Sequence, residues 1–260
     1  MDYKELLKDN VKKISKLQDK LYAQDKYSVL VIFQALDAAG KDSTIKHVFS
    51  GVNPQGCVVH SFKKPTKEEY DHHFLWKGTK CLPERGIIGV YNRSYYEEVI
   101  ITQVHPELIV KQRIPGYDSL DDIDRKFWKD RYQQINDFER NLSENGTIII
   151  KFYLDISKEE QRNRFIRRIE NPDKNWKFEM GDLNERLFWD DYQIILKDVI
   201  KETNTKNGRW YKIPADDKPK MRYMVSEKII ETLEKYNIDY PEIDDIKRND
   251  LKEAKERLKY

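Results

Sequence analysis

The chain has 260 residues, 38% of them hydrophobic and 36% charged, and its 48 basic and 46 acidic side chains leave a net charge of +2. This length suits one α/β domain with an accessory lid, while the near-neutral charge excludes a general nucleic-acid binder with a uniformly basic surface. No window approaches the ~20 apolar residues of a membrane span and no secretory segment is visible, so we expect a cytoplasmic protein that binds neither membrane nor nucleic acid.

Apolar periodicity predicts helices and strands that alternate along the chain. A charged amphipathic helix is expected over residues 3–24, before a strand at 28–35 and a helix at 42–51. Later strands are expected at 58–62, 86–91, 147–154 and 210–213, and later helices at 66–76, 121–142, 155–170, 184–202 and 221–236. This alternation indicates a mostly parallel sheet covered by helices on both faces.

The first predicted strand runs into a Gly-Lys turn and then a helix, which outlines a phosphate-binding loop. Backbone N–H groups and the positive end of the helix would hold a phosphate there, and Lys41 would add a mobile charge. The pattern departs from G-x-x-x-x-G-K-[ST], because Ala35 replaces the first glycine and Asp42 follows the lysine. The predicted phosphate- or nucleotide-binding residues are Ala38, Ala39, Gly40, Asp42, Ser43 and Thr44.

In the usual pattern a Ser or Thr hydroxyl directly after the lysine binds the metal ion, and this chain lacks a hydroxyl at that position. Ser43 and Thr44 lie one and two places later than the usual hydroxyl, so Asp37 inside the loop is the nearest candidate metal ligand. A carboxylate among phosphate-binding amides is sensible only when a divalent cation sits between the two anions. The alternative is a simple helix cap, in which Asp42 or Ser43 satisfies free N–H groups.

Polar residues follow the strand predicted at 86–91, where a parallel sheet usually faces its ligand. Asn92 occupies the place of the acidic residue that positions magnesium in phosphate-loop kinases, which leaves Asp37 and Glu97 to supply carboxylates. Arg93 would stabilise the negative charge of a transferring phosphate. The alternative for this stretch is a turn that ends the strand.

An arginine-dense helix follows the strand predicted at 147–154. Helical periodicity places Arg164, Arg167 and Arg168 on one face and Arg162 elsewhere. These arginines would bind phosphate; the alternative is a solvated face that pairs with neighbouring glutamates.

Many short blocks, in order along the chain, resemble the polyphosphate kinase 2 family from about residue 10 to 237. They span residues 35–46, 53–56, 61–63, 74–76, 92–98, 104–107, 175–178 and 213–218. The resemblance implies a thymidylate-kinase-like P-loop fold, a three-layer α/β/α domain with a parallel sheet and a helical lid. It also implies phosphate transfer between inorganic polyphosphate and nucleotides with Mg²⁺, for which Mn²⁺ is a possible substitute.

The resemblance also suggests how the chain is organised. We expect a single P-loop kinase-like domain over residues 1–260, with an N-terminal helix at 1–25, a lid at about 157–185 and a charged tail at 241–260. We expect a homo-oligomer, either a dimer or a tetramer. A linear polyanion needs a basic track to the loop, and the predicted polyphosphate-binding residues are Lys46, Lys63, Lys64, Arg164, Arg167 and Arg168.

The predicted reaction is transfer of a terminal phosphate from polyphosphate to AMP and ADP, and the reverse transfer from ATP. Many members of the family carry Asp where this chain has Asn92, whereas the class III subgroup that phosphorylates both AMP and ADP is similar to this chain in having Asn. The alternatives are an ATP-dependent nucleoside monophosphate kinase and a non-catalytic polyphosphate or nucleotide sensor. The predicted catalytic residues are Asp37, Lys41, Asn92, Arg93 and Glu97, with Asp37 also the metal ligand.

Overall fold

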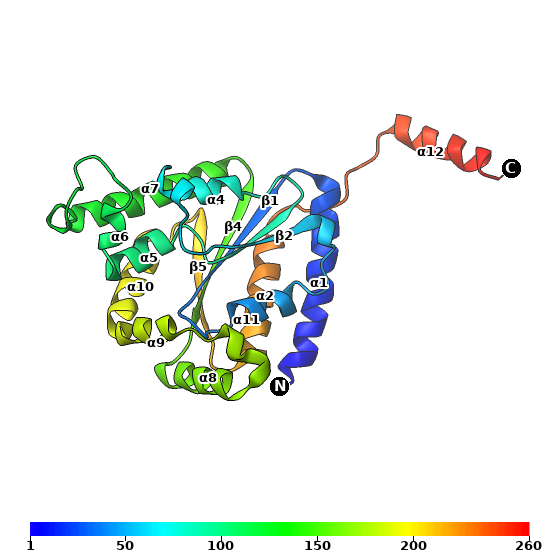
Figure 1. Cartoon of the computed structure of the whole chain (residues 1–260). Coiled ribbons are helices and arrows are strands. Elements are labelled where there is room, and N and C mark those ends of the chain that lie inside the picture. Colours follow the sequence, from blue (N-terminus) through cyan, green and yellow to red (C-terminus); the bar gives the residue numbers. More distant parts are fainter. Residues whose placement is uncertain (260) are drawn as a thin grey trace.

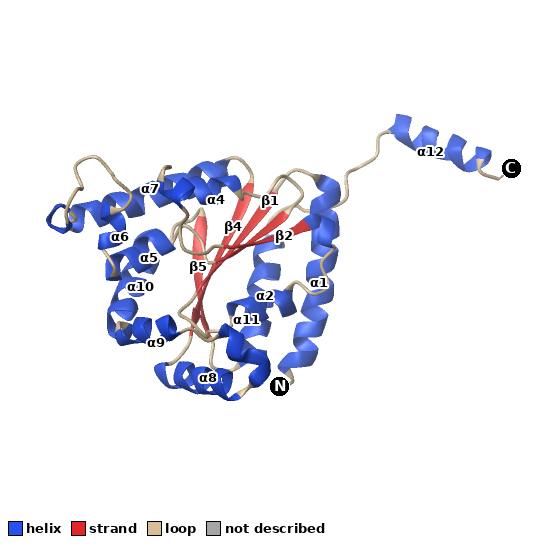
Figure 2. Ribbon diagram, in the orientation of Figure 1, coloured by secondary structure: helices blue, strands red, loops and turns tan. Residues whose placement is uncertain are grey.

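A five-stranded parallel sheet organises the structure, a computed structural model that describes residues 1–259. The strands lie in the order β2-β3-β1-β4-β5, and each neighbouring pair runs parallel (Figure 2). Their bounds are β1 Ser28–Gln34, β2 Cys57–Ser61, β3 Ile88–Asn92, β4 Thr147–Asp155 and β5 Gly208–Pro214. The predicted α/β fold and its parallel sheet are confirmed.

Helices cover both faces of this sheet (Figure 1). One face carries α1 Tyr3–Gln24, α2 Lys41–Val48 and α11 Lys218–Leu233, and the other carries α5 Glu97–Val104, α7 Arg125–Glu144 and α10 Trp189–Thr203. The short elements are η1 Pro54–Gly56, α3 Lys67–Tyr70, α4 Trp76–Lys80, α6 Glu107–Val110, η2 Leu120–Asp122 and η3 Pro172–Lys177. The segment predicted to form a lid contains α8 Lys158–Glu170 and α9 Met180–Leu187, and the C-terminal tail contains α12 Asp245–Arg257.

The central strand β1 is buried along its whole length and separates two hydrophobic clusters. Val29, Val31 and Phe33 belong to the cluster under α1 and α11, whereas Leu30 and Ile32 belong to the cluster under α7 and α10. Alternate residues of a strand point to opposite faces, so an unbroken apolar run is what a sheet covered on both sides requires. Because β1 is held in the core along its whole length, the position at which it ends and the loop at 35–40 begins is fixed.

Two predicted helices differ from the structure. The helix expected at 66–76 begins with a capping box at Thr66 but ends at Tyr70, and the chain turns before α4 so that Leu75 packs into the core. The helix expected at 184–202 is two helices that meet at Phe188, a bend that buries Trp189 and leaves Leu187 exposed.

The C-terminal tail stands away from the body. Helix α12 projects beyond α1 at the end of an extended connection, and none of its side chains is buried (Figure 1). Within residues 1–259, none of the helices combines the length and the apolar character needed to cross a bilayer.

Candidate active site

The loop between β1 and α2 has the conformation of a phosphate-binding turn. Gly40 precedes the first turn of α2 with φ at 103°, a left-handed conformation that glycine adopts without strain. Ala38 is also left-handed, with φ at 63°, which costs energy for a residue with a Cβ atom. Contacts from outside the loop must therefore hold this turn in place.

Arg164 on α8 supplies those contacts. Its Nη1 atom donates to the carbonyl oxygens of Ala38 and Ala39 at 3.1 and 2.7 Å. Its Nη2 atom donates to the carbonyl oxygens of Ala215 and Asp216 at 2.6 and 3.0 Å, and its Nε atom donates to Glu160 at 2.8 Å. All five guanidinium donors are thus used within the protein. Arg164 was expected to line a polyphosphate track, but it is buried and braces the loop from behind.

The loop lysine is folded back against its own loop. Lys41 Nζ donates to the carbonyl oxygen of Ala35 at 2.7 Å. Burial, together with the positive charge of Arg93, lowers the pKa of Lys41 to about 8, although the carboxylates of Asp37 and Glu97 oppose the shift. A lysine held only by carbonyl oxygens is free to turn toward a stronger anionic partner such as a phosphate.

Arg93 brings the end of β3 to the loop. Its Nη2 atom lies 2.8 Å from Asp37 Oδ1, and its own backbone is left-handed, with φ at 64°. Its backbone N–H donates to the carbonyl oxygen of Phe33 at 3.0 Å, which ties β3 to the end of β1. Burial opposes the charged form of Arg93, but Glu97 and Asp37 outweigh this and raise its pKa. Burial also raises the pKa of Glu97, against the effect of Arg93 and Lys41.

These groups surround a small cavity of about 50 Å³ between the loop, α5 and the lid. Its polar lining includes Gln34, Asp37, Arg93, Glu97, Gln161, Asp182, Glu185 and Arg186. The lid touches the loop directly, because Gln161 Nε2 donates to the carbonyl oxygen of Asp37 at 3.0 Å. Burial and the nearby charge of Asp37 raise the pKa of Asp182 to about 6.

Asn92 and Asp42 interact with each other at the rim of the site. Asn92 Nδ2 donates to Asp42 Oδ1 at 2.7 Å, and the Asp42 carboxylate also lies 3.8 Å from Lys177 Nζ. The hydroxyls of Ser43 and Thr44 donate to the carbonyl oxygen of Gly40 at 3.2 and 3.0 Å. The structure therefore brings all the predicted catalytic and loop residues to the carboxyl ends of β1 and β3.

The predicted basic residues separate into different environments. Arg167 is exposed and pairs with Glu160, whereas Arg168 lies 3.5 Å from Asp182. Lys46, Lys63 and Lys64 are exposed.

Helix α11 adds basic residues at the loop that sequence reasoning missed. Arg222 Nη2 donates to Ser43 Oγ at 3.2 Å. Burial and the positive charges of Arg164, Arg167 and Arg222 lower the pKa of Lys218, so cations crowd together here. Lys218 and Arg222 are four positions apart, so they lie on one face of the helix. This spacing is the feature of the sequence from which a basic face on α11 could have been predicted.

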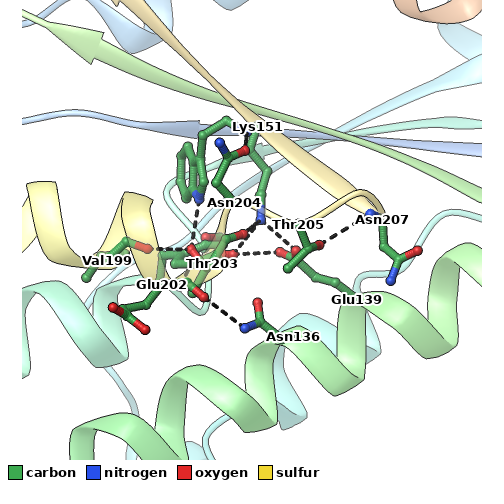
Figure 3. A network of polar contacts seen from close by, with 12 residues as sticks. Asn136, Glu139, Lys151, Val199, Glu202, Thr203, Asn204, Thr205 and Asn207 are labelled. Atoms are coloured by element: carbon green, nitrogen blue, oxygen red, sulfur yellow. Dashed lines mark hydrogen bonds and ion pairs between the residues drawn. The ribbon is translucent and has the colours of Figure 1, made fainter.

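A buried polar network anchors the segment between Arg93 and Glu97. Figure 3 shows Lys151 pointing toward Glu139, with 2.6 Å between Lys151 Nζ and Glu139 Oε2, and both side chains have no exposed surface. The hydroxyls of Tyr95 and Tyr96 donate to Glu139 Oε1 at 2.9 and 2.8 Å. The two residues that follow the Arg93–Ser94 turn are thereby fixed to α7.

The carboxylates at the loop suit a divalent cation that is shared with phosphate. In residues 1–259 no group of three or more His, Cys, Asp or Glu side chains is arranged to hold a metal ion alone. Asp37 and Asp182 both line the cavity, and burial together with the charge of Asp37 raises the pKa of Asp182. The two carboxylates are therefore close enough to repel each other, and a cation between them would relieve this repulsion. Mg²⁺ usually binds through one or two carboxylates, water and substrate phosphate oxygens, and the residues present fit that mode.

A glycine–lysine loop at the carboxyl end of a central parallel strand, covered by α8 and α9, places the chain in the class of P-loop kinase-like proteins. A profile of the polyphosphate kinase 2 (PPK2) family matches residues 1–241. The chain belongs to this family, which confirms the predicted family.

Individual relatives agree with this assignment. The chain is 48% identical to the ADP-polyphosphate phosphotransferase of Rhodopseudomonas palustris, over 98% of this chain and 88% of that protein. It is 42% identical to the AMP/ADP-polyphosphate phosphotransferase of Meiothermus ruber, over 89% of this chain and 81% of that protein. The crystal structure of polyphosphate kinase 2 from Arthrobacter aurescens matches with a TM-score of 0.86 and 37% identity, covering 96% of this chain and 85% of that one.

Proposed function

We propose that this chain transfers the terminal phosphate of inorganic polyphosphate to AMP and ADP, reversibly and with Mg²⁺ as its metal. The observation that carries the proposal is the convergence of Lys41, Arg93 and Asp37 at one loop, two cations and one carboxylate within a phosphate-binding turn. Relatives named for phosphotransfer between polyphosphate and ADP or AMP support it.

In this mechanism the protein positions phosphates and neutralises their charge. Lys41 leaves the carbonyl oxygen of Ala35 and binds the phosphate that is transferred, while Arg93 stabilises charge on its equatorial oxygens. An oxygen of the acceptor's terminal phosphate attacks that phosphorus, and the bond to the shortened polyphosphate breaks, so no covalent enzyme intermediate forms. Asp37 would hold Mg²⁺, or Mn²⁺ in its place, which supplies Lewis-acid stabilisation of the phosphate oxygens.

The polyphosphate would approach along the basic surface beside α2, α8 and α11. We assign this role to Lys46, Arg167, Arg168, Lys218 and Arg222 on these helices, and to Lys63 and Lys64 in the connection that follows β2. The lowered pKa of Lys218 supports the assignment, because crowded cations gain most from a bound polyanion. Arg164 is left out, since its donors already bind backbone carbonyl oxygens.

The acceptors in the proposal are both AMP and ADP. Asn92 supports dual use, because it is the residue shared with the AMP/ADP-phosphorylating subgroup that the sequence resembles. Its neutral amide also bonds the Asp42 carboxylate at 2.7 Å, a contact that a second carboxylate would turn into repulsion.

The decisive experiment incubates the purified full chain with AMP, Mg²⁺ and polyphosphate in the absence of ATP. We expect ADP first and ATP afterwards, measured by anion-exchange chromatography. A parallel reaction in which ATP replaces polyphosphate as donor tests the nucleoside monophosphate kinase alternative. Failure to form nucleotide product from polyphosphate removes the proposal, and formation of ADP without ATP removes its dual-acceptor part.

We also propose that the protein assembles as a homo-oligomer, a dimer or a tetramer, through its tail. Ile246, Leu251 and Leu258 are exposed on α12, which stands clear of the body (Figure 1). Light scattering should give two or four chain masses per particle for the full chain, and a single chain mass per particle after deletion of residues 241–260. We place the protein in the cytoplasm, whose reducing conditions suit the free thiols of Cys57 and Cys81.

A further inference from the structure

A second and much larger cavity, the α7 pocket, lies away from the phosphate-binding loop. It occupies about 820 Å³ between the segment at 70–75, the segment at 112–117 and the first half of α7. Within residues 1–259 it shares no lining residue with the cavity at the loop, and Figure 1 shows α7 near the top of the body and α8 at its bottom. Ligand pockets for small molecules commonly have about 300–1,000 Å³, so a small organic molecule fits in this space.

Arg131 of α7 lines this pocket with a hydrogen-bond donor that is not used. Only 4% of Arg131 is exposed, and its guanidinium lies over two aromatic rings, 4.0 Å from the centre of Phe74 and 5.1 Å from that of Phe127. Its Nη2 atom donates to Gln112 Oε1 at 2.6 Å, but its buried Nη1 atom has no partner in the part of the chain that the structure describes. A buried donor on a charged group is costly without an acceptor, so a ligand that supplies one is favoured.

Two carboxylates line the same pocket, and each is already paired with a cation. Asp71 forms an ion pair with Arg113, and Asp130 Oδ2 lies 2.6 Å from Lys126 Nζ. Both aspartates are exposed, so they lie where the pocket meets solvent. These carboxylates would repel a ligand with several negative charges, whereas their own cations offset the repulsion of a single one.

Arg131 itself contacts a neutral amide in place of a carboxylate. Gln112 accepts from Arg131 and donates through Nε2 to Glu98 Oε2 at 2.6 Å, so an amide separates the two charges. Burial lowers the pKa of Arg131 to about 10, although Glu98 opposes the shift, and the guanidinium is therefore charged at neutral pH. The free Nη1 atom and the second N–H of Nη2 match the two oxygens of a carboxylate.

The remaining walls of the pocket supply flat apolar surface. Phe74, Tyr117 and Phe127 line it, and the ring centres of the last two lie 4.7 Å apart. Aromatic side chains of this kind pack best against another ring, stacked with an offset or edge to face. A ligand that joins one carboxylate to an aromatic body therefore matches both the buried cation and the rings.

We propose that the α7 pocket is a binding site for a small aromatic monocarboxylate, whose carboxylate accepts from Arg131 and whose ring lies among Phe74, Tyr117 and Phe127. The site is separate from phosphate transfer and does not rest on the proposed function. A polyanion is disfavoured by Asp71 and Asp130, and an uncharged molecule leaves the buried guanidinium without a counter-charge.

Cinnamate is the probe for this site, and cinnamamide is its uncharged counterpart of the same shape. Isothermal titration of the full chain should show cinnamate binding, with cinnamamide at least about tenfold weaker because the charge-assisted hydrogen bonds are lost. Saturating polyphosphate should leave the affinity for cinnamate within about twofold, because the two cavities share no lining residue within residues 1–259. Absence of cinnamate binding, equal binding of cinnamamide, or displacement of cinnamate by polyphosphate overturns the inference.

Arg131→Met tests the cation directly, because it removes the charge and keeps a long apolar side chain against the rings. We expect the affinity for cinnamate to fall at least about tenfold and the affinity for cinnamamide to change little. Arg125→Gln, at an exposed arginine on the same helix, is the matched control and should leave both affinities unchanged. Equal affinity for cinnamate in Arg131→Met and the wild-type chain overturns the inference.

Tyr117→Ala serves if Arg131→Met fails to fold, because Tyr117 is only half-buried and belongs to the segment at 112–117 rather than to a helix. Loss of one aromatic contact should weaken the binding of both cinnamate and cinnamamide about fivefold. Unchanged affinity for cinnamate in this variant also overturns the proposed position of the ligand ring.

Discussion

Arg93 Nη2 lies 2.8 Å from Asp37 Oδ1, so the residue that follows β3 holds the only carboxylate within the turn at 35–40. The contact does two things at once. It orients Asp37 toward the cavity, and it keeps a cation beside the position where a phosphate gathers negative charge. A metal ion that binds Asp37 therefore joins an existing charge pair, and Arg93 is freed to share its second donor edge with phosphate.

Asp37→Asn should abolish most phosphate transfer, because it keeps the shape of the side chain but removes the charge that both a divalent cation and Arg93 require. We expect kcat/KM with polyphosphate and AMP to fall about 100-fold or more. Raising the Mg²⁺ concentration should not restore it. Asp9→Asn, at an exposed position of α1, is the control. Near-normal turnover of Asp37→Asn at ordinary Mg²⁺ concentration would rule out its metal role.

Arg164 and Arg167 lie on the same helix, yet they should respond differently to substitution. Arg164→Gln leaves several loop carbonyl oxygens unpaired and should cost about 3 kcal/mol of stability, measured by urea unfolding. Arg167→Gln should leave stability within about 0.5 kcal/mol and raise the KM for polyphosphate about threefold at low salt. If Arg164→Gln folds normally and raises only that KM, its bracing role is wrong.

Local pattern was enough to predict much of this fold. The apolar run of β1 and the amphipathic repeat of α1 are carried by neighbouring residues, so strand, helix and loop were found close to their observed positions. The positions of the predicted catalytic residues could be inferred because these residues come directly after strands, where parallel topology fixes their location.

Contacts between distant segments escaped prediction. Arg164 and Arg167 look equivalent on a helical wheel, and only the packing of α8 against the loop buries one and exposes the other. Arg222 reaches Ser43 across 179 positions of sequence. The environment of Arg131 on α7 likewise depends on other segments, because its guanidinium lies over the ring of Phe74 and donates to Gln112 Oε1. Periodicity identifies a face but does not identify what covers it.

The lowered pKa of Lys41 should be visible in the pH dependence. With a pKa of about 8 in the free protein, kcat/KM for polyphosphate should decline above pH 8 as the ammonium loses its proton. The kcat at saturating polyphosphate should persist to higher pH, because a bound polyanion favours the charged lysine. The control is Lys41→Arg, whose guanidinium stays charged, so its profile should lack this decline. A flat wild-type profile would contradict the assignment.

The same shift affects stability. The pKa of Lys41 in the folded protein, about 8, lies below the ordinary lysine pKa of 10.5, so the unfolded chain binds more protons between these values. This residue therefore makes the protein more stable as pH rises through that window.

Substitutions at Glu139 and Lys151 should separate an effect on stability from an effect on activity. Glu139→Leu leaves the Lys151 ammonium buried without its carboxylate and should cost about 3–5 kcal/mol. Adding Lys151→Met should restore most of that stability. The double variant should nevertheless keep a kcat about tenfold low, because Tyr95 and Tyr96 have lost the acceptor that fixes the segment before Glu97. Full recovery of kcat would limit the network to a role in stability.

Asp182 offers a test of the charge crowding under the lid. Burial and the charge of Asp37 raise its pKa to about 6 from the ordinary aspartate pKa of 3.8, so the folded chain binds more protons than the unfolded chain between these values. Stability due to this residue therefore falls as pH rises through that window, and above pH 6 the ionised carboxylate is a net cost. Asp182→Asn should raise the free energy of unfolding at pH 8 by about 1 kcal/mol, a value reduced by solvent screening, and have little effect at pH 4.

Urea unfolding at both pH values measures this difference, and Asp190→Asn, an exposed carboxylate on α10, is the control. The opposing contact is Arg168 Nη1, which lies 3.5 Å from Asp182. If Asp182→Asn destabilises the protein at pH 8, the attraction of Arg168 outweighs burial and the repulsion from Asp37. In that case the ion pair holds the lid down. If the variant stabilises the protein as expected, the repulsion between Asp182 and Asp37 favours an open lid until a cation neutralises both carboxylates.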